Sequence, residues 1–433
     1  MPYGIINKYL TKDKFILLEN MFSLGVLQLF MYVIPLLTTP YLVRVLGAEG
    51  FGKIAIASAV ITFLGIMTDY GFNLSATRSI SVNRDNVEKI SEIYSCVFTI
   101  KCILLMLSFS ILMIYLFFIN EGLVIRDRLL YVFSFGQVIG QVLLPLWLYQ
   151  GLEQMKIITK INLFIRLFFL LMIFFVIKND HDYYIVPLIT SLGSIFGGVW
   201  AIWYVKYKLE IKLTKPKLPV MKVYLYEGFS FFGIAASSTI LASSSLLFLG
   251  FYTNQETVGV YSAIERIVKA VQSLFSPITQ AFFPYISRLF LVSKEQAVNE
   301  IKKLIYILST CVLLLLLIIN FMSNDIIFLF YGEKYEKYSY IFLLLSPWFF
   351  LGILNNVLGC QLLTAIGRGG LYFKMFIIAS VSTIVLFIFL IPQYGINGVP
   401  YAMSLGEFIL FILLSISSKF IFKQFLGSCY GKN

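Results

Sequence analysis

Six basic residues lie inside stretches of the chain that are otherwise apolar. Four of them, Lys101, Arg166, Arg266 and Lys269, are candidates for binding a charged headgroup. A charge at the centre of a bilayer costs at least about 2.5–3.5 kcal/mol on insertion scales, so such groups face protein or a water-filled cavity. Clustered cations repel one another unless an anion binds, and arginine forms bidentate bonds to phosphate. These residues therefore predict a cargo that carries phosphate or pyrophosphate.

Three acidic residues of the apolar stretches, Asp69, Glu265 and Glu407, are candidates for coupling to a proton or Na⁺ gradient. Glu265 and Lys269 are four residues apart on one face of a predicted helix, so a local ion pair is an alternative role for both. Arg266 lies about 100° further round that helix and needs another partner. The sequence leaves these alternatives open.

Most other chemistry is excluded by the residue types. The single histidine, His181, lies in a short polar loop, which excludes a site built from several histidines. The five cysteines lack CxxC or metal-ligand spacing, so we expect free thiols. The chain has no nucleotide-binding P-loop, so we do not expect it to use ATP directly. We predict no catalytic residues, no metal and no cofactor beyond a coupling H⁺ or Na⁺. A net charge of +12 fits lysines on cytoplasmic loops, so we expect no nucleic-acid partner.

The apolar stretches are long enough to cross a membrane. Of the 433 residues, 59% are hydrophobic and 13% are charged, which leaves no room for a separate soluble domain. A membrane-spanning helix needs about 20 mostly apolar residues, so the sequence predicts an all-α, polytopic membrane protein with about 12 transmembrane helices. These are expected at residues 16–42, 52–71, 92–119, 129–150, 157–177, 184–205, 224–251, 257–284, 303–322, 339–366, 371–391 and 397–418.

The loops between these helices predict an orientation and a division into halves. Lys and Arg are roughly three times as frequent on one set of loops as on the other, which places both termini in the cytoplasm. A basic linker at 206–223 separates an N-terminal lobe, 1–205, from a C-terminal lobe, 224–433. The lobes begin with the same spacing of Lys, Glu and Gly, which indicates two six-helix lobes related by a pseudo-two-fold axis along the membrane normal. The matching residues are Lys14, Glu19 and Gly25, and Lys222, Glu227 and Gly233.

The helix expected at 224–251 carries a run of hydroxyl side chains. Small hydroxyl residues let helices pack closely, and this is one interpretation of the run. The other is a polar cavity wall suited to sugar hydroxyls. The residues are Ser237, Ser238, Thr239, Ser243, Ser244 and Ser245.

Three blocks of the sequence resemble a known family. Residues 35–47, PLLTTPYLVRVLG, with the GFG that follows at 50–52, are similar to a signature of the Wzx-type polysaccharide repeat-unit flippases. These belong to the multidrug/oligosaccharidyl-lipid/polysaccharide exporter superfamily. Residues 68–78 resemble the next block of that family, and residues 149–156 resemble its turn between the fourth and fifth helices.

The resemblance implies a flippase for undecaprenyl-pyrophosphate-linked oligosaccharide in the bacterial inner membrane, used for O-antigen or capsular polysaccharide. It also implies a V-shaped pair of lobes in the lipid bilayer that alternate access to a cationic cavity. A polysaccharide polymerase and a chain-length regulator are the expected partners. The resemblance assigns no individual cavity residue, so the site residues above rest on the charge argument alone.

Two other functions are weighed against this one. A cation-coupled multidrug exporter of the same superfamily would need acidic cavity residues, whereas basic residues outnumber acidic ones inside the predicted helices. A membrane-embedded polysaccharide polymerase would need a long outer loop with catalytic arginines or carboxylates. The largest expected outer loop, 323–338, is short, so the sequence favours a transporter over an enzyme.

Overall fold

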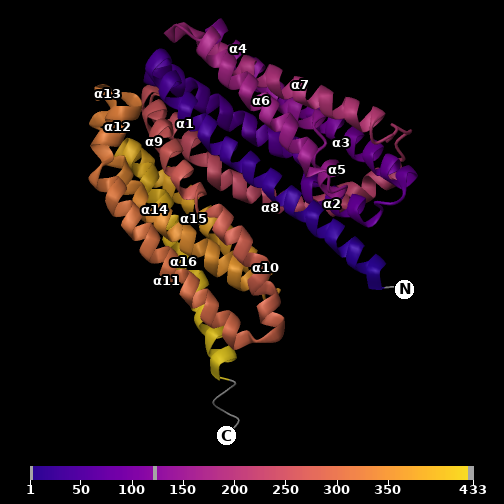
Figure 1. The fold of residues 1–433 in the computed structure, drawn as a ribbon. Coiled ribbons are helices and arrows are strands. Elements are labelled where there is room, and N and C mark those ends of the chain that lie inside the picture. Colours follow the sequence, from indigo (N-terminus) through magenta and orange to yellow (C-terminus); the bar gives the residue numbers. More distant parts are fainter. Residues whose placement is uncertain (1–2, 120–123, 428–433) are drawn as a thin grey trace. The chain divides into compact units, whose positions relative to one another are not determined.

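The computed structural model describes the backbone of residues 3–119 and 124–427. Side chains are described from residue 33 to residue 422, apart from gaps at 119–123, 230–231, 234–235, 237–238, 240–242, 277, 280–281 and 284. Every regular element of the described backbone is a helix, which confirms the all-α fold (Figure 1). The chain divides into two compact units, Met1–Ile240 and Leu241–Asn433.

The first unit contains all helices up to the first part of α8. The long helix α1 joins the two helices expected at 16–42 and 52–71, and the break between them is at Gly47, whose φ of 70° suits glycine. The short helix after Gly71 was not expected from the sequence. The elements are α1 (Tyr3–Asp69), α2 (Phe72–Val82), α3 (Val87–Ile114), η1 (Tyr115–Ile119), α4 (Ile125–Leu143), α5 (Leu146–Gly151), α6 (Met155–Val176), η2 (Asp180–Tyr184), α7 (Ile185–Tyr207) and α8 (Leu218–Tyr252).

Helices α4 and α7 pack closely because small residues face each other. A Cβ atom added at Gly140 of α4 would lie 2.5 Å from the Cβ of Ser194 on α7. One added at Gly136 would lie 2.6 Å from the Cβ of Ser191. Small residues let membrane helices approach each other, so dispersion contacts can hold them together where lipid removes the hydrophobic driving force.

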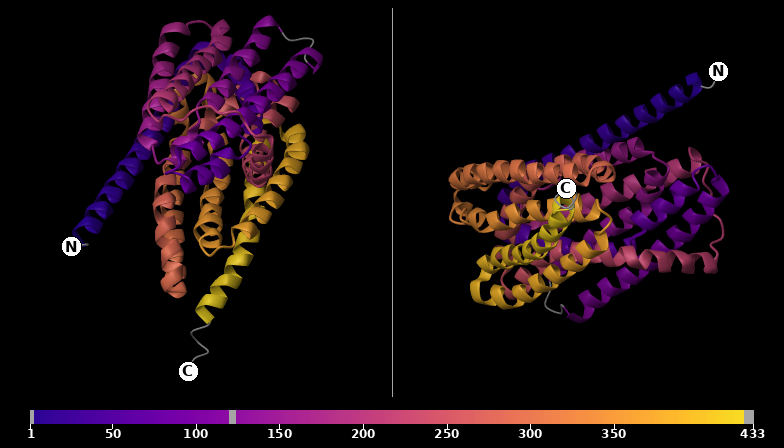
Figure 2. Two further views of the ribbon diagram at one scale, coloured as in Figure 1. Left: turned by 90° about the vertical axis from the view of Figure 1, so that its right-hand side faces the viewer. Right: turned by 90° about the horizontal axis from the view of Figure 1, so that it is seen from below.

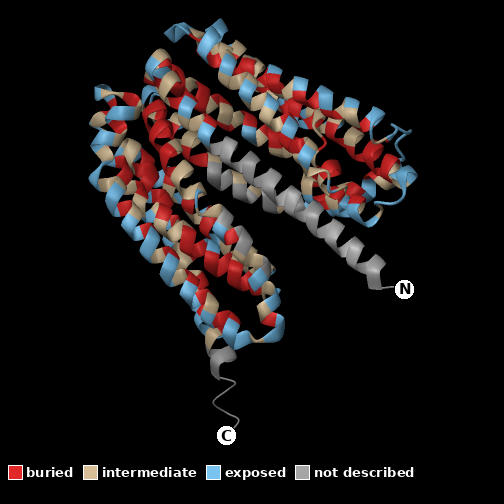
Figure 3. Cartoon of the chain, viewed as in Figure 1, coloured by how far each residue is buried: buried red, intermediate tan, exposed pale blue. Residues whose placement is uncertain are grey.

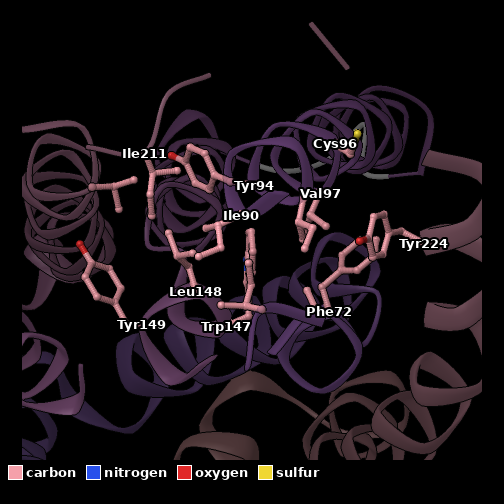
Figure 4. Packing of buried hydrophobic residues seen from close by; sticks show 14 of the residues in the cluster. Phe72, Ile90, Tyr94, Cys96, Val97, Trp147, Leu148, Tyr149, Ile211 and Tyr224 are labelled. Atoms are coloured by element: carbon pink, nitrogen blue, oxygen red, sulfur yellow. The ribbon is translucent and has the colours of Figure 1, made fainter. Parts of the chain in front are cut away.

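A buried apolar cluster holds together one end of the first unit (Figure 4). Its members include Trp147 of α5, which is 1% exposed, Phe72 of α2 and Tyr94 of α3, and the ring centroids of Trp147 and Tyr94 lie 6.0 Å apart. Tyr149 adds a hydrogen bond, because its hydroxyl donates to the carbonyl oxygen of Ala201 on α7 at 2.7 Å. The cluster therefore fixes α2, α3, α5 and α7 relative to one another.

The basic segment between α7 and α8 packs against α3. Ile211 is 3% exposed and belongs to the same apolar cluster. The backbone N–H of Thr214 donates to the Ser95 hydroxyl at 2.7 Å. Lys217 Nζ lies 2.9 Å from a carboxylate oxygen of Glu92, and this carboxylate raises the pKa of Lys217. The predicted linker at 206–223 lies within the first unit, and the predicted lobe boundaries stay predictions.

In the second unit, helices α11, α14, α15 and α16 run side by side (Figures 1 and 2). Side chains cap two of its helices: Asn254 accepts from the N–H of Thr257 at the start of α9, and Ser293 accepts from that of Gln296 at the start of α11. The elements are α9 (Gln255–Ser273), α10 (Ser276–Val292), α11 (Lys294–Phe321), α12 (Ser323–Tyr331), α13 (Glu333–Glu336), α14 (Ile341–Asn356), η3 (Val357–Thr364), α15 (Gly369–Tyr394), η4 (Gly395–Asn397) and α16 (Gly398–Gly427).

In both units, helices expose large apolar side chains, as contact with a bilayer requires. Leu317 and Phe321 on α11 are 67% and 91% exposed, and Phe175 on α6 is 73% exposed. Figure 3 shows such exposed positions along the outer helices of each unit. The described residues hold 8 candidate membrane spans, of which Val33–Val82 and Gly369–Phe422 have 50 and 54 residues. The chain is thus a multi-pass membrane protein, while the count of twelve spans stays a prediction.

Candidate functional site

The structure brings together two of the charged residues that the sequence singled out. Lys101 on α3 is 2% exposed, and its Nζ lies 3.0 Å from Oδ1 of Asp69 at the end of α1. The other carboxylate oxygen of Asp69 accepts a hydrogen bond from Nδ2 of Asn73 at 2.9 Å. A lysine so deeply buried needs its counter-ion. In this structure Lys101 is therefore a partner of Asp69 rather than an open cation.

Asp69 also lines a cavity of about 380 Å³ within the first unit. The cavity is bounded by α1, α4 and α8, and both apolar and polar residues line it; Ile61, Ile66 and Val138 are the apolar ones. The polar residues that line it are Ser58, Thr62, Asp69, Gln137, Gln141 and Thr239.

Sequence reasoning missed the two glutamines of this wall. Gln137 and Gln141 are four residues apart, so they lie on one face of α4. Two amides at this spacing in an otherwise apolar helix are a sequence signal for a polar surface on that helix. Thr239 comes from the hydroxyl run of α8, whereas the side chains of Ser237 and Ser238 lie outside the described residues.

Arg166 lies near the middle of α6, which packs against α1 and α7. Its Nε atom is buried and has no hydrogen-bond partner among the described residues. A buried N–H group without a partner costs about 1–3 kcal/mol, so this guanidinium keeps unused binding capacity. Arg166 does not line the cavity that contains Asp69.

The charged segment of α9 forms its own network in the second unit. Lys269 Nζ lies 3.1 Å from Oε1 of Glu265, which is 2% exposed, and the Ser245 hydroxyl donates to the same oxygen at 3.4 Å. The local ion pair between Glu265 and Lys269 is therefore present. Arg266 interacts electrostatically with Glu265 and with Tyr331 of α12. The network holds two basic groups and one acidic group, so it has an excess of positive charge.

Glu407 lies in a second polar cluster, formed by α9, α14 and α16. Its Oε2 accepts a hydrogen bond of 2.6 Å from Nδ2 of Asn355. The Oδ1 atom of Asn355 is buried and has no partner among the described residues. Gly352 keeps the cluster open, since a Cβ atom there would lie 3.1 Å from Nε2 of Gln272 and 3.8 Å from Oε1 of Glu407.

The described residues hold no group of three or more His, Cys, Asp or Glu side chains that could bind a metal ion. Four cysteines in this part of the chain are free thiols: Cys96, Cys102, Cys311 and Cys360. The fifth, Cys429, lies outside the described residues.

Two curated relatives are named for the export or synthesis of polysaccharide. The chain is 29% identical over 375 residues to a protein of Escherichia coli K12 named "Putative O-antigen transporter". This alignment covers 86% of this chain and 90% of that protein. It is 20% identical over 276 residues to the capsular polysaccharide biosynthesis protein CapF of Staphylococcus aureus, covering 62% and 68%.

Two solved structures share the fold. The lipid II flippase MurJ, in an inward closed conformation, has a TM-score of 0.73 at 16% identity and covers 91% of this chain and 87% of its own. An inward-facing multidrug transporter of the MATE family has a TM-score of 0.67 at 13% identity, covering 92% and 99%. At these identities the likeness concerns the fold alone.

The family itself follows from a match that spans more than half of the chain. The sequence pattern of the family described as "polysaccharide biosynthesis protein" matches residues 17–290. This range includes all three blocks on which the sequence resemblance rests, and it confirms that resemblance. The chain belongs to the polysaccharide biosynthesis protein family of multi-pass membrane proteins.

Proposed function

We propose that this chain moves lipid-linked oligosaccharide repeat units across the bacterial inner membrane. The cargo is an oligosaccharide on undecaprenyl pyrophosphate, taken from the cytoplasmic leaflet to the outer leaflet for O-antigen or capsular polysaccharide biosynthesis. Family membership and relatives named for O-antigen transport and capsule synthesis support this cargo. The fold shared with a lipid II flippase supports the same mode of transport. On this proposal both termini are cytoplasmic, and a polymerase with its chain-length regulator uses the units delivered outside.

The observation that carries the headgroup proposal is the Nε of Arg166, which has no hydrogen-bond partner in the described part of the chain. A pyrophosphate offers several anionic oxygens, which accept bidentate bonds from a planar guanidinium. Arg266 and Lys269 add positive charge in the second unit, where Glu265 balances one of the two. Alternating access would then present each basic site to the headgroup in turn, while the lipid tail stays in the bilayer.

Coupling to an ion gradient is proposed for Glu407. Its carboxylate and Oδ1 of Asn355, which has no partner among the residues whose side chains are described, are two oxygen acceptors in one buried cluster. Oxygen acceptors of this kind suit a proton or Na⁺, and buried acids in membrane helices mark ion pathways. Asp69 and Glu265 are weaker coupling candidates, because each already has a lysine partner.

The test is transfer of an undecaprenyl-pyrophosphate-linked oligosaccharide across proteoliposome membranes. Arg166→Gln and Arg266→Gln should each lower the rate about 10- to 100-fold, the range expected for one lost hydrogen bond to a charged group. Arg128→Gln is the matched control, since Arg128 is exposed at the start of α4. All variants must first insert and fold as the unmodified protein does.

The outcomes separate the alternatives. Transfer that survives both arginine changes would keep the flippase and remove these two residues from the headgroup site. Movement of small organic cations, with no transfer of lipid-linked sugars, would assign the chain to the multidrug exporters instead.

Ion coupling needs a separate assay. Glu407→Gln should abolish the stimulation of transfer by an imposed proton or Na⁺ gradient, because the amide cannot gain or lose a proton and carries no charge. Glu333→Gln, at an exposed position, should leave the stimulation unchanged. Transfer by the unmodified protein that is the same with and without both gradients contradicts the coupling proposal.

A further inference from the structure

The cavity between α1, α4 and α8 has a chemical character unlike that of the basic sites. Its volume of about 380 Å³ falls in the lower part of the range of small-molecule pockets, about 300–1,000 Å³. It therefore admits a small polar group rather than a whole oligosaccharide.

The wall of the cavity offers both donors and acceptors of hydrogen bonds. Thr62 is exposed there, and its hydroxyl proton is used in a 2.7 Å bond to the carbonyl oxygen of Ser58, so the oxygen is left as an acceptor. Gln141 is also exposed and has an amide that donates and accepts. Gln137 donates from Nε2 to the Thr190 hydroxyl at 3.1 Å, which orients its amide.

The charge of the cavity is balanced. Among the described residues that line it, Asp69 is the one ionisable group, and Lys101 neutralises it at 3.0 Å. A phosphate that entered the cavity would be repelled by the Asp69 carboxylate. A cation would gain little there, because Lys101 already neutralises that carboxylate. A neutral ligand with many hydroxyl groups meets neither obstacle, because each hydroxyl both donates and accepts.

The geometry points to a saccharide subsite in this cavity: it binds one neutral sugar residue of the cargo, through Thr62, Gln137, Gln141 and Thr239. This inference rests on the proposed function and deepens it. It separates recognition of the sugar, in the first unit, from recognition of the pyrophosphate by basic groups. Gly65 makes room for the ligand, since a Cβ atom there would lie 3.0 Å from Oε1 of Gln141.

The first experiment measures binding without transport. The full-length protein in nanodiscs is mixed with free N-acetylhexosamines, hexoses and deoxyhexoses, and contact is detected by saturation-transfer NMR. At least one sugar should receive saturation from the unmodified protein, and Gln141→Leu should remove that signal. If no neutral sugar shows transfer, or if Gln141→Leu leaves the signal intact, the subsite is refuted, whatever the outcome of the flipping assay.

The second experiment uses transport to distinguish this site from the headgroup site. Thr62→Val and Gln141→Leu should each slow transfer of a lipid-linked oligosaccharide about 2- to 10-fold, the range for one neutral hydrogen bond. Gly65→Ala should slow it as well, because the added methyl group would occupy space beside the Gln141 amide. Transfer of undecaprenyl pyrophosphate without sugar should not change. Equal losses on both lipids would overturn the subsite.

Matched controls exist outside the cavity. Thr310 on α11 is exposed and bonds to the carbonyl oxygen four residues earlier, as Thr62 does, so Thr310→Val repeats the chemical change elsewhere. Gln393→Leu does the same for an exposed glutamine near the end of α15. Failure of transfer by the unmodified protein would count against the proposed flippase, while sugar binding that Gln141→Leu abolishes would still support the subsite.

Discussion

Nζ of Lys101 lies 3.0 Å from Oδ1 of Asp69, and this ion pair joins the middle of α3 to the end of α1. The side chain of Lys101 is 3% exposed and that of Asp69 is 15% exposed. The lysine is therefore shielded from bulk water, while the aspartate borders the cavity. A buried pair contributes little net stability, but removal of one partner leaves an uncompensated charge. Two residues that look like independent functional charges in the sequence are thus one structural unit.

The first prediction concerns this pair. Lys101→Met should lower the free energy of unfolding by about 3 kcal/mol, because Asp69 loses its counter-ion. The double variant Lys101→Met/Asp69→Asn should recover most of that loss. Reversible unfolding in detergent or bicelles measures both. Lys374→Met, at an exposed position on α15, should have little effect, and the absence of recovery in the double variant would contradict the pairing.

The second prediction concerns the contact between α4 and α7. Gly140→Ala should destabilise the protein by about 1–3 kcal/mol, since the new Cβ would lie 2.5 Å from the Cβ of Ser194 and must push the helices apart. Gly370→Ala is the matched control, because nothing lies within 4 Å of a Cβ added there. Equal thermal stability of the two variants would be evidence against close packing at Gly140.

The third prediction concerns the segment that joins α7 to α8. Ile211→Ala should cost about 2–4 kcal/mol, because the isoleucine side chain is buried in the apolar cluster of the first unit. Leu213→Ala, two residues further on, should change stability little, since Leu213 is 62% exposed. Limited proteolysis gives a second measure: the segment should be cut faster in the Ile211 variant alone.

The fourth prediction concerns a cluster that links α1, α4 and η2. The Tyr183 hydroxyl donates to Oδ1 of Asp127 at 2.6 Å, and Lys53 Nζ lies 3.3 Å from the same oxygen. Tyr183→Phe should lower the free energy of unfolding by about 1.5–3 kcal/mol, the range for a hydrogen bond to a charged group. A thermal unfolding midpoint unchanged by Tyr183→Phe would show that this bond adds nothing to stability.

The fifth prediction concerns orientation. In a variant without native cysteines, Leu213→Cys should react with an impermeant thiol reagent only from the cytoplasmic side. Asp325→Cys, in the exposed first turn of α12, should react only from the opposite side. Labelling of both positions from the same side would contradict the topology inferred from the distribution of Lys and Arg.

Much of the fold could be predicted from the sequence, because the composition of each segment determines whether it forms a helix. Runs of apolar residues must become helices in a bilayer, since every backbone polar group has to be satisfied within its own segment. Most of the expected ranges fall within helices of the described structure, and Gly47 marks the break between the first two. The helix expected at 257–284 is instead divided into α9 and α10, and α10 continues to Val292. The helix α2 was missed because its 11 residues are too few and too polar for a membrane span. The segment expected as a loop at 323–338 was also predicted wrongly, because it forms α12 and α13, which are too short to be recognised as membrane spans.

The sequence could not predict which residues pair with the charged side chains, except where both members of a pair lie on the same helix. Glu265 and Lys269 are four residues apart, so helical periodicity alone predicts their contact, and the structure has it. Lys101 and Asp69 are 32 residues apart, and no local pattern relates them. Asn355 and Glu407 are 52 residues apart and meet only because α14 packs against α16.

The sequence by itself determined that the chain is an all-α membrane protein and which family it resembles. Both depend on the order and composition of residues along the chain. Tertiary structure alone decided that Lys101 is neutralised by Asp69, that Nε of Arg166 has no partner in the described part of the chain, and that Gln137 and Gln141 line one cavity. These properties depend on which helix faces pack together. That choice is made by small residues and shape across distant segments, which a one-dimensional pattern does not encode.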